Sequence, residues 1–206
     1  MQCDFSLLKS TVTRFSHDLA GVISAVANSL SLLEELGGGD QETLDLATDN
    51  ANTLMGRLRF FRAAFGNEGP LTDLSVTRTI FENYLKTLEN KVVRYESVWQ
   101  VDEEQPLFVF RLILLGGTVA AETLPRGGRI SVCALAGCRQ LRIEAEGKTI
   151  SLEPELQAVL NGKNEEVSLP KLMPASFLMM CLAEHGWRIS LSCQDEKIII
   201  ELSDKQ

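Results

Sequence analysis

His17 and the acidic residue that follows it, Asp18, are the residues with the clearest chemical potential. His17 is one of only two histidines in the 206 residues. A neutral imidazole offers a nucleophilic nitrogen, and a nearby carboxylate can hold the proton on the other nitrogen. Such a pair is suited to carrying a phosphoryl group on the imidazole. Adjacent residues do not share a helix face, so we expect Asp18 to reach His17 only in a favourable rotamer.

A helical pattern predicted from about Asp4 to Leu36 positions His17. With a rotation of about 100° per residue, one side of this helix is apolar. This side consists of Leu8, Val12, Phe15, Leu19, Val22, Val26 and Leu33. His17 falls almost opposite, and its nearest neighbours on that face are small or polar: Ser10, Thr13, Gly21, Ser24 and Asn28. The pattern therefore predicts an exposed imidazole on an uncrowded surface where a partner can dock.

A second helix is predicted from about Gln41 to Phe65, with apolar residues again three and four positions apart. Gly37–Gly39 ends the first helix, and Asp40 is a good N-cap for the second. Two long helices joined by so short a connection form an antiparallel hairpin. One hairpin buries its apolar seam poorly by itself. We therefore expect two chains to complete a four-helix bundle, which makes the protein a homodimer.

The turn residues 66–70 mark a change of pattern and divide the chain into predicted domains 1–68 and 69–206. In the second domain helices are predicted at about Val76–Asn90, Pro106–Leu124, Glu153–Leu160 and Lys171–His185. Strands are predicted at Ser97–Asp102, Arg129–Leu135, Gln140–Glu146, Lys148–Leu152, Arg188–Cys193 and Lys197–Leu202. This order predicts an α+β sandwich, with helices layered on one face of a mostly antiparallel sheet.

The composition excludes several classes of function. A net charge of −8 argues against nucleic acid and against an anionic membrane surface as the main partner. No apolar run is long enough to cross a bilayer, and the N-terminus lacks the pattern of a secretory signal. The five cysteines, Cys3, Cys133, Cys138, Cys181 and Cys193, have no zinc-site spacing. We therefore expect a cytoplasmic protein with reduced, mostly buried thiols and no metal site.

The other polar clusters are typical of structural or solvated positions. His185 directly precedes Gly186 at a predicted helix end, where capping or packing is the expected role. Asp102–Glu104 falls in a predicted loop and is interpreted as solvated charge. Gly127 and Gly128 do not precede a lysine at the spacing of a phosphate-binding loop.

The segment Phe15-Ser16-His17-Asp18-Leu19 in a helical hairpin resembles the dimerisation and phosphoacceptor hairpin of two-component histidine kinases. The region from Phe110 to Val132 resembles the ATPase domain that follows it. The family's Pro-Arg-Gly-Gly-like turn matches residues 125–128 and places Val119 where kinases have an asparagine that helps to hold magnesium and ATP. Residues 144–148, Glu-Ala-Glu-Gly-Lys, stand where the family has Asp-x-Gly-x-Gly, and a glycine-rich lid is missing.

A kinase-like layout without these nucleotide motifs is similar to the ChpT-type histidine phosphotransferases of alphaproteobacteria and, more distantly, to the sporulation phosphotransferase of bacilli. The resemblance implies a bacterial, dimeric phosphorelay protein that carries a phosphoryl group on His17 between receiver-domain aspartates, with Asp18 assisting. The receiver would dock on Arg14, Gly21, Ser24 and Asn28. It implies no bound cofactor, with Mg²⁺ held by the receiver.

Two alternatives remain open at this point. One is an active ATP-dependent histidine kinase, against which the valine at position 119 speaks. The other is not an enzyme: a dimeric adaptor that binds response regulators without transfer. Phosphorylation of His17 separates the adaptor from the phosphotransferase, and ATP binding separates the kinase from both.

Overall fold

The computed structural model describes residues 5–38, 40–66, 71–134, 139–162 and 169–204. These residues form an α+β structure, as predicted, and its sheet has five strands where six were predicted. Its helices are α1 Phe5–Glu35, α2 Gln41–Phe65, α3 Leu74–Leu88, α4 Leu107–Glu122, α5 Pro154–Leu160 and α6 Met173–Glu184. Its strands are β1 Arg94–Val101, β2 Gly127–Ala134, β3 Gln140–Glu146, β4 Trp187–Gln194 and β5 Lys197–Asp204.

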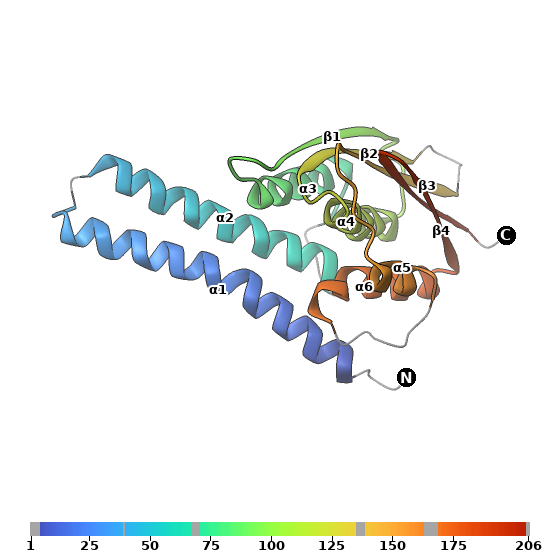
Figure 1. The fold of residues 1–206 in the computed structure, drawn as a ribbon, viewed down its shortest axis with the longest axis horizontal. Helices are drawn as coiled ribbons and strands as arrows, with labels where there is room; N and C mark the ends of the chain where they lie inside the picture. Colours follow the sequence, from blue (N-terminus) through green and yellow to red (C-terminus); the bar gives the residue numbers. More distant parts are fainter. Residues whose placement is uncertain (1–4, 39, 67–70, 135–138, 163–168, 205–206) are drawn as a thin grey trace.

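The two long N-terminal helices α1 and α2 run side by side in opposite directions and extend away from the rest of the molecule (Figure 1). Asp40 caps α2 by accepting a hydrogen bond from the backbone N–H of Thr43 at 2.8 Å. Such a cap satisfies one of the free N–H groups of the first helical turn. The α2 boundaries coincide with the prediction, and α1 ends one residue before the predicted Leu36, while its predicted start at Asp4 lies outside the described residues.

Aromatic side chains join these two helices to each other and to α3. The rings of Phe15 and Phe61 stack at 4.6 Å between centroids, and those of Phe60 and Tyr84 stack at 3.7 Å. Phe60 and Tyr84 are buried within the same hydrophobic core as the sheet. The long helices are thus anchored to the C-terminal part at the end nearest His17. The proposed boundary between the domains falls on residues 67–70, outside the described residues.

The sheet has the strand order β1-β2-β3-β5-β4. Only the β1–β2 pair is parallel, and the other three pairs are antiparallel. Inward residues alternate with outward ones along β2 and β3, as expected for a sheet covered on one face. Ile130, Val132, Ile143 and Ala145 face the helices, whereas Arg142 and Glu144 lie on the other face with Lys197.

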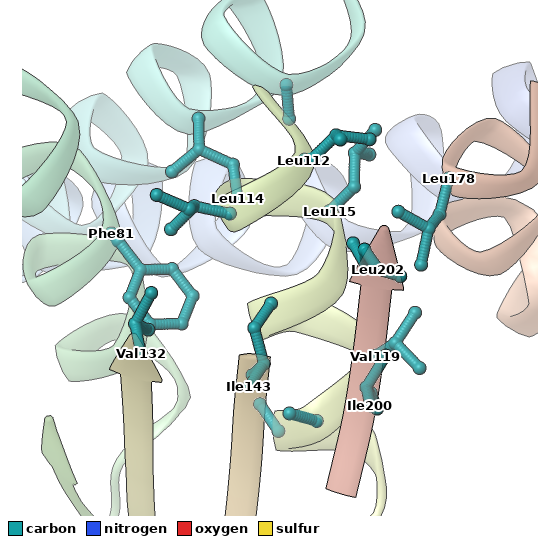
Figure 2. Close-up of a cluster of buried hydrophobic side chains, with 14 of the residues drawn as sticks. Phe81, Leu112, Leu114, Leu115, Val119, Val132, Ile143, Leu178, Ile200 and Leu202 are labelled. Atoms are coloured by element: carbon teal, nitrogen blue, oxygen red, sulfur yellow. The ribbon is translucent and has the colours of Figure 1, made fainter. Parts of the chain in front are cut away.

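Helix α4 crosses the covered face of the sheet and carries the core (Figure 2). All ten residues from Leu112 to Ala121 are buried, and they lie within the helix predicted at Pro106–Leu124. Two glycines allow its close packing. A Cβ on Gly116 would lie 2.6 Å from Ile143 of β3, and one on Gly117 would lie 2.5 Å from the Phe81 ring of α3. A side chain at Gly116 would displace the end of the Ile143 side chain, and one at Gly117 would collide with the Phe81 ring.

Two predicted elements are wrong in detail. Residues 148–152 are not a strand. The backbone N–H of Ser151 instead bonds to Thr123 O at 2.9 Å, so this segment follows the end of α4 and joins no sheet edge. The predicted helix Lys171–His185 begins as a 3₁₀ turn at Pro170–Leu172 and becomes α-helical only from Met173. Pro174 in the first turn of α6 is compatible with this late start.

The described cysteines are free thiols in different environments. Cys181 is buried, Cys133 is half-buried and Cys193 is exposed, so the expectation of mostly buried thiols is wrong for Cys193. Cys3 and Cys138 lie outside the described residues. Burial raises the pKa of the Cys181 thiol, which suppresses its reactivity. Among the described helices, none has the length and apolar character that a bilayer crossing requires.

Candidate functional site

His17 lies on the exposed face of α1, near the middle of the helix, and its side chain is 86% exposed. This confirms the predicted exposure of His17, but Ser10, which was predicted on the same face, is buried. Gly21, Ser24 and Asn28 on the same face are also exposed. The position of a Cβ on Gly21 has nothing within 4 Å. The imidazole is therefore open to a large incoming partner.

Asp18 does reach His17, although the two residues are neighbours in the helix. Its Oδ1 lies 3.3 Å from Nδ1 of His17, and its side chain is only 19% exposed. An ionised carboxylate only accepts hydrogen bonds, so this contact requires the proton of a neutral imidazole on Nδ1. The lone pair of a neutral imidazole is then on Nε2, the nitrogen that faces a partner. The same proton arrangement is what a nucleophilic Nε2 requires.

Arg14, one helical turn earlier, holds the second oxygen of this carboxylate. Its Nε donates to Asp18 Oδ2 at 2.6 Å, and its Nη2 donates to Glu122 Oε1 at 3.1 Å. Nη1 lies 3.4 Å from the carbonyl oxygen of Lys171. Arg14 was predicted to dock a receiver, but its side chain is 19% exposed and these contacts engage it within the chain. It links the histidine helix to the end of α4.

Burial and ion pairing act on the Arg14 guanidinium in opposite directions. Burial lowers its pKa, but the carboxylates of Glu122 and Asp18 outweigh this effect and raise the pKa overall. Arg14 is thus a permanent cation at the base of the site. It neutralises part of the negative charge that Asp18 and Glu122 bring together.

Glu122 is the last residue of α4, and its side chain is 24% exposed. Burial raises the pKa of this carboxyl to about 7, because Arg14 offsets only part of the desolvation and Asp18 and Glu153 add repulsion. A carboxylate at a helix C-terminus is also unfavourably placed in the helix dipole. No role was predicted for Glu122 from the sequence. An acidic residue ending a helix that is otherwise apolar is the signal that would have marked it.

A second arginine, Arg57 of α2, supports the backbone under the site. Its Nη1 donates to the carbonyl oxygen of Asp18 at 2.6 Å, and its Nη2 donates to the carbonyl oxygen of Thr87 at 3.1 Å. Arg57 therefore connects the histidine helix to the C-terminal end of α3. The sequence analysis did not identify this residue, because the contact spans 39 positions along the chain.

The positions that match the nucleotide motifs of kinases are occupied by packing and by surface ion pairs. Val119 is completely buried and lies beside Ile200 in the core (Figure 2). Glu144 points away from α4, and its carboxylate contacts Arg142 at 2.6 Å and Lys197 at 2.9 Å. Within the described ranges, no cluster of three or more His, Cys, Asp or Glu side chains has the arrangement of a metal site.

His185, the other histidine, has the structural role expected of it. It caps the C-terminus of α6, and its ring stacks on Phe108 at 4.1 Å between centroids. Asp102 and the acidic residues after it are exposed, as expected for solvated charge. His17 is therefore the histidine available for chemistry with a partner.

Comparisons with known proteins identify relatives of the chain and of its fold. The chain is 24% identical over 193 residues to the protein phosphotransferase ChpT of Brucella abortus, and the match covers 91% of this chain and 90% of that protein. A solved bacterial phosphotransferase has the same fold, with a TM-score of 0.82, 24% identity and 98% of each chain covered. The blue-light activated histidine kinase of Erythrobacter litoralis matches with a TM-score of 0.48 and 13% identity, over 91% of this chain and 58% of that one.

The family comparison covers more than half of the chain. The model of the histidine phosphotransferase C-terminal domain matches residues 77–197, which run from α3 to the start of β5. This stretch contains Glu122 and lies against the helix that carries the exposed His17. The chain belongs to the histidine phosphotransferase family, and it is a phosphotransferase of two-component phosphorelays.

Proposed function

We propose that His17 carries the phosphoryl group between the aspartates of two receiver domains. The observation that carries this proposal is the exposed imidazole whose Nδ1 faces Asp18, because this leaves Nε2 as the nucleophile. The Nε2 lone pair attacks the phosphorus of an aspartyl phosphate, and the P–O bond to the receiver carboxylate breaks. The carboxylate leaves with the electron pair, and the Nδ1 proton stays beside Asp18. The second receiver then reverses this step.

The chain's own contribution to this reaction is positioning and charge placement. The imidazole is held in one tautomer and one orientation before the receiver binds. Part of the entropic cost of orienting the reacting groups is therefore already met when the receiver arrives. Phosphohistidine carries a positively charged ring, which the Asp18 carboxylate stabilises. Mg²⁺ is expected on the receiver, and this chain is proposed to bind no cofactor. Because receivers act in the cytoplasm, we place the protein there.

Transfer of radioactive phosphate tests the assignment of His17. A receiver domain of the host that is charged with [³²P]acetyl phosphate and labels the wild-type protein serves as the donor. The label should be acid-labile and alkali-stable, as phosphohistidine is, and it should be absent from His17→Gln. His185→Gln is the matched control and should be labelled normally. Equal labelling of His17→Gln would refute the proposal.

The receiver is proposed to dock on the exposed face formed by Gly21, Ser24 and Asn28. These side chains are small or short, so a receiver surface can approach the imidazole closely. Arg14 supports this face through its contacts within the chain, and its side chain is not free to contact the receiver. The substitution Ser24→Arg should weaken receiver binding, whereas Gln41→Arg at the far end of the two helices should not. Equal receiver affinity for both variants would exclude this surface.

We further propose that the protein is a homodimer through α1 and α2, which would form a four-helix bundle. On one side of each helix, large apolar side chains are about half exposed: Leu8, Val12, Ile23, Leu30, Leu44 and Met55, whereas the exposed Leu32 and Leu46 lie on other sides. On α1 they are 4, 11 and 7 positions apart, and on α2 they are 11 apart, so each set forms one stripe. A second copy presents the same two stripes, which suits a two-fold interface. The α1 stripe lies well away from His17 around the helix, so pairing would leave the imidazole open.

A further inference from the structure

A continuous line of polar contacts runs from the exposed imidazole to the end of α4. Asp18 uses Oδ1 for His17 and Oδ2 for the Nε of Arg14. Arg14 uses a different nitrogen, Nη2, for Glu122. Each group in the line therefore uses separate atoms for its two neighbours. A change at Glu122 is transmitted to His17 through the orientation of Arg14 and then of Asp18.

We propose that Glu122 is a positioning residue for phosphoryl transfer: by holding Arg14 against Asp18, it keeps the Nδ1 proton of His17 in place and Nε2 free to attack. Glu122 touches no reacting atom itself. This inference rests on the proposed function of His17. It adds that the C-terminal part of the chain supplies a group to the site on α1, across 108 positions of sequence.

The location of Glu122 is hard to explain by stability alone. A carboxylate that is mostly buried at a helix C-terminus costs free energy even when it is paired. Asp18 already gives Arg14 one carboxylate partner at 2.6 Å, so the second carboxylate is not needed to neutralise the guanidinium. The second carboxylate instead fixes the orientation of the Arg14 guanidinium, because it holds the far end of this planar group while Nε bonds to Asp18.

The charge of Glu122 depends on every element packed around it. Arg14 and Asp18 face it from α1, and Glu153 repels it from the residue before α5. The pKa of Lys171 is raised mainly by Glu153, and the pKa values of Tyr84 on α3 and Tyr95 on β1 are raised mainly by burial; the charge of Glu122 adds to all three shifts. With a pKa of about 7, the carboxyl changes charge near neutrality. Below that pH it is a neutral acceptor for Arg14, and above it becomes an ion-pair partner.

Glutamine at position 122 reproduces the neutral form permanently, because its amide oxygen can still accept from Arg14. At pH 8, Glu122→Gln should transfer phosphate about tenfold more slowly at saturating donor receiver, at the lower end of the cost of losing an outer partner of a functional imidazole. The receiver concentration at half-maximal rate should not change, since the docking face is intact. As the pH falls through 7, the difference from wild type should shrink.

Glu153→Gln is the matched control. It removes the same charge from the same neighbourhood but takes it from an exposed side chain that pairs with Lys171 and not with Arg14. It should retain the wild-type rate at pH 8, and its pH profile should move only toward lower pH, because Glu153 is one of the charges that raise the pKa of Glu122. A Glu122→Gln protein that transfers at the wild-type rate at pH 8 would overturn the inference.

Imidazole ¹⁵N spectra separate positioning from a general loss of structure. With only two histidines, the spectrum contains His17 and His185, and His185 serves as an internal reference. In wild type at pH 8, His17 should be predominantly protonated on Nδ1. In Glu122→Gln it should move toward the other tautomer while His185 is unchanged. A slower variant with an unchanged His17 tautomer would show a structural effect and would overturn the inference.

Combining substitutions tests whether Glu122 acts through Asp18. In an Asp18→Asn background, adding Glu122→Gln should cause no further loss of rate, because the link is already broken. An additional tenfold loss would overturn the inference. The two proposals fail separately. Labelling of His17→Gln refutes the phosphoacceptor, whereas normal transfer by Glu122→Gln with label on His17 refutes only the role of Glu122.

Discussion

Arg14 Nη2 lies 3.1 Å from Glu122 Oε1, and this ion pair joins the helix of the exposed histidine to the last residue of α4. The pair is separated by 108 positions in sequence. It makes the C-terminal part of the chain a component of the site rather than a neighbour of it.

Asp18→Asn should reduce phosphoryl transfer by about a hundredfold, within the range for loss of an acid–base partner. Asparagine can present its amide N–H₂ to Nδ1, which favours the tautomer with the proton on Nε2 and blocks the nucleophile. Single-turnover transfer from a labelled receiver measures the effect. Asp195→Asn, an exposed substitution in the β4–β5 turn, is the control and should transfer normally. A rate for Asp18→Asn equal to the control would exclude this role.

The stability of the protein should contain a contribution from Glu122 that falls as pH rises. The folded-state pKa of about 7 is above the ordinary value of 4.5, so the folded state binds this proton more tightly than the unfolded state. The contribution is therefore fully present below about pH 4.5 and is lost by about pH 7. Between pH 5 and pH 8, the free energy of unfolding of the wild type should therefore fall by about 2 kcal/mol relative to that of Glu122→Gln.

Urea unfolding at four pH values measures this difference, because other titrating groups affect both proteins equally. Glu153→Gln should show no comparable shift. A constant difference between wild type and Glu122→Gln from pH 5 to pH 8 would contradict the raised pKa. Together with slower transfer by Glu122→Gln at pH 8, a positive result would show stability given up for function at this residue.

Val119→Asn should destabilise the fold by about 2 kcal/mol or more without creating ATP binding. The position is fully buried among aliphatic side chains, so the amide would have no hydrogen-bond partner. Thermal unfolding measures the loss, and calorimetric titration with Mg·ATP measures binding. Val119→Ala separates lost packing from the cost of the buried amide and should be the milder change. Micromolar ATP binding by wild type would revive the kinase hypothesis.

Ile23→Glu should dissociate the proposed dimer, because it puts a charge into the apolar stripe of α1. Light scattering after size exclusion should give the mass of two chains for wild type and one chain for the variant. Ala20→Glu, at an exposed position outside the stripe, is the control and should remain dimeric. A wild-type mass of 22.8 kDa in solution would refute the dimer.

The helices and the exposure of His17 follow from local patterns, and so they could be predicted. The three-four spacing and the Asp40 cap give the bounds of α2, and the wheel places His17 opposite the apolar side. Residues 148–152 were predicted as a strand because local alternation cannot show that Ser151 bonds to the end of α4. The Arg14–Glu122 and Arg57–Asp18 contacts depend on tertiary packing of distant segments, so no local pattern reveals them.

The two arginines hold α1 on both sides of the histidine, Arg14 toward α4 and Arg57 toward α3. Because α1 is held at two points, it cannot rotate about either of them. His17 is therefore held in a fixed position relative to the sheet, and the incoming receiver alone has to reach the correct orientation. Association and dissociation of the receivers, rather than a rearrangement of this chain, should then limit the rate of phosphoryl transfer through the relay.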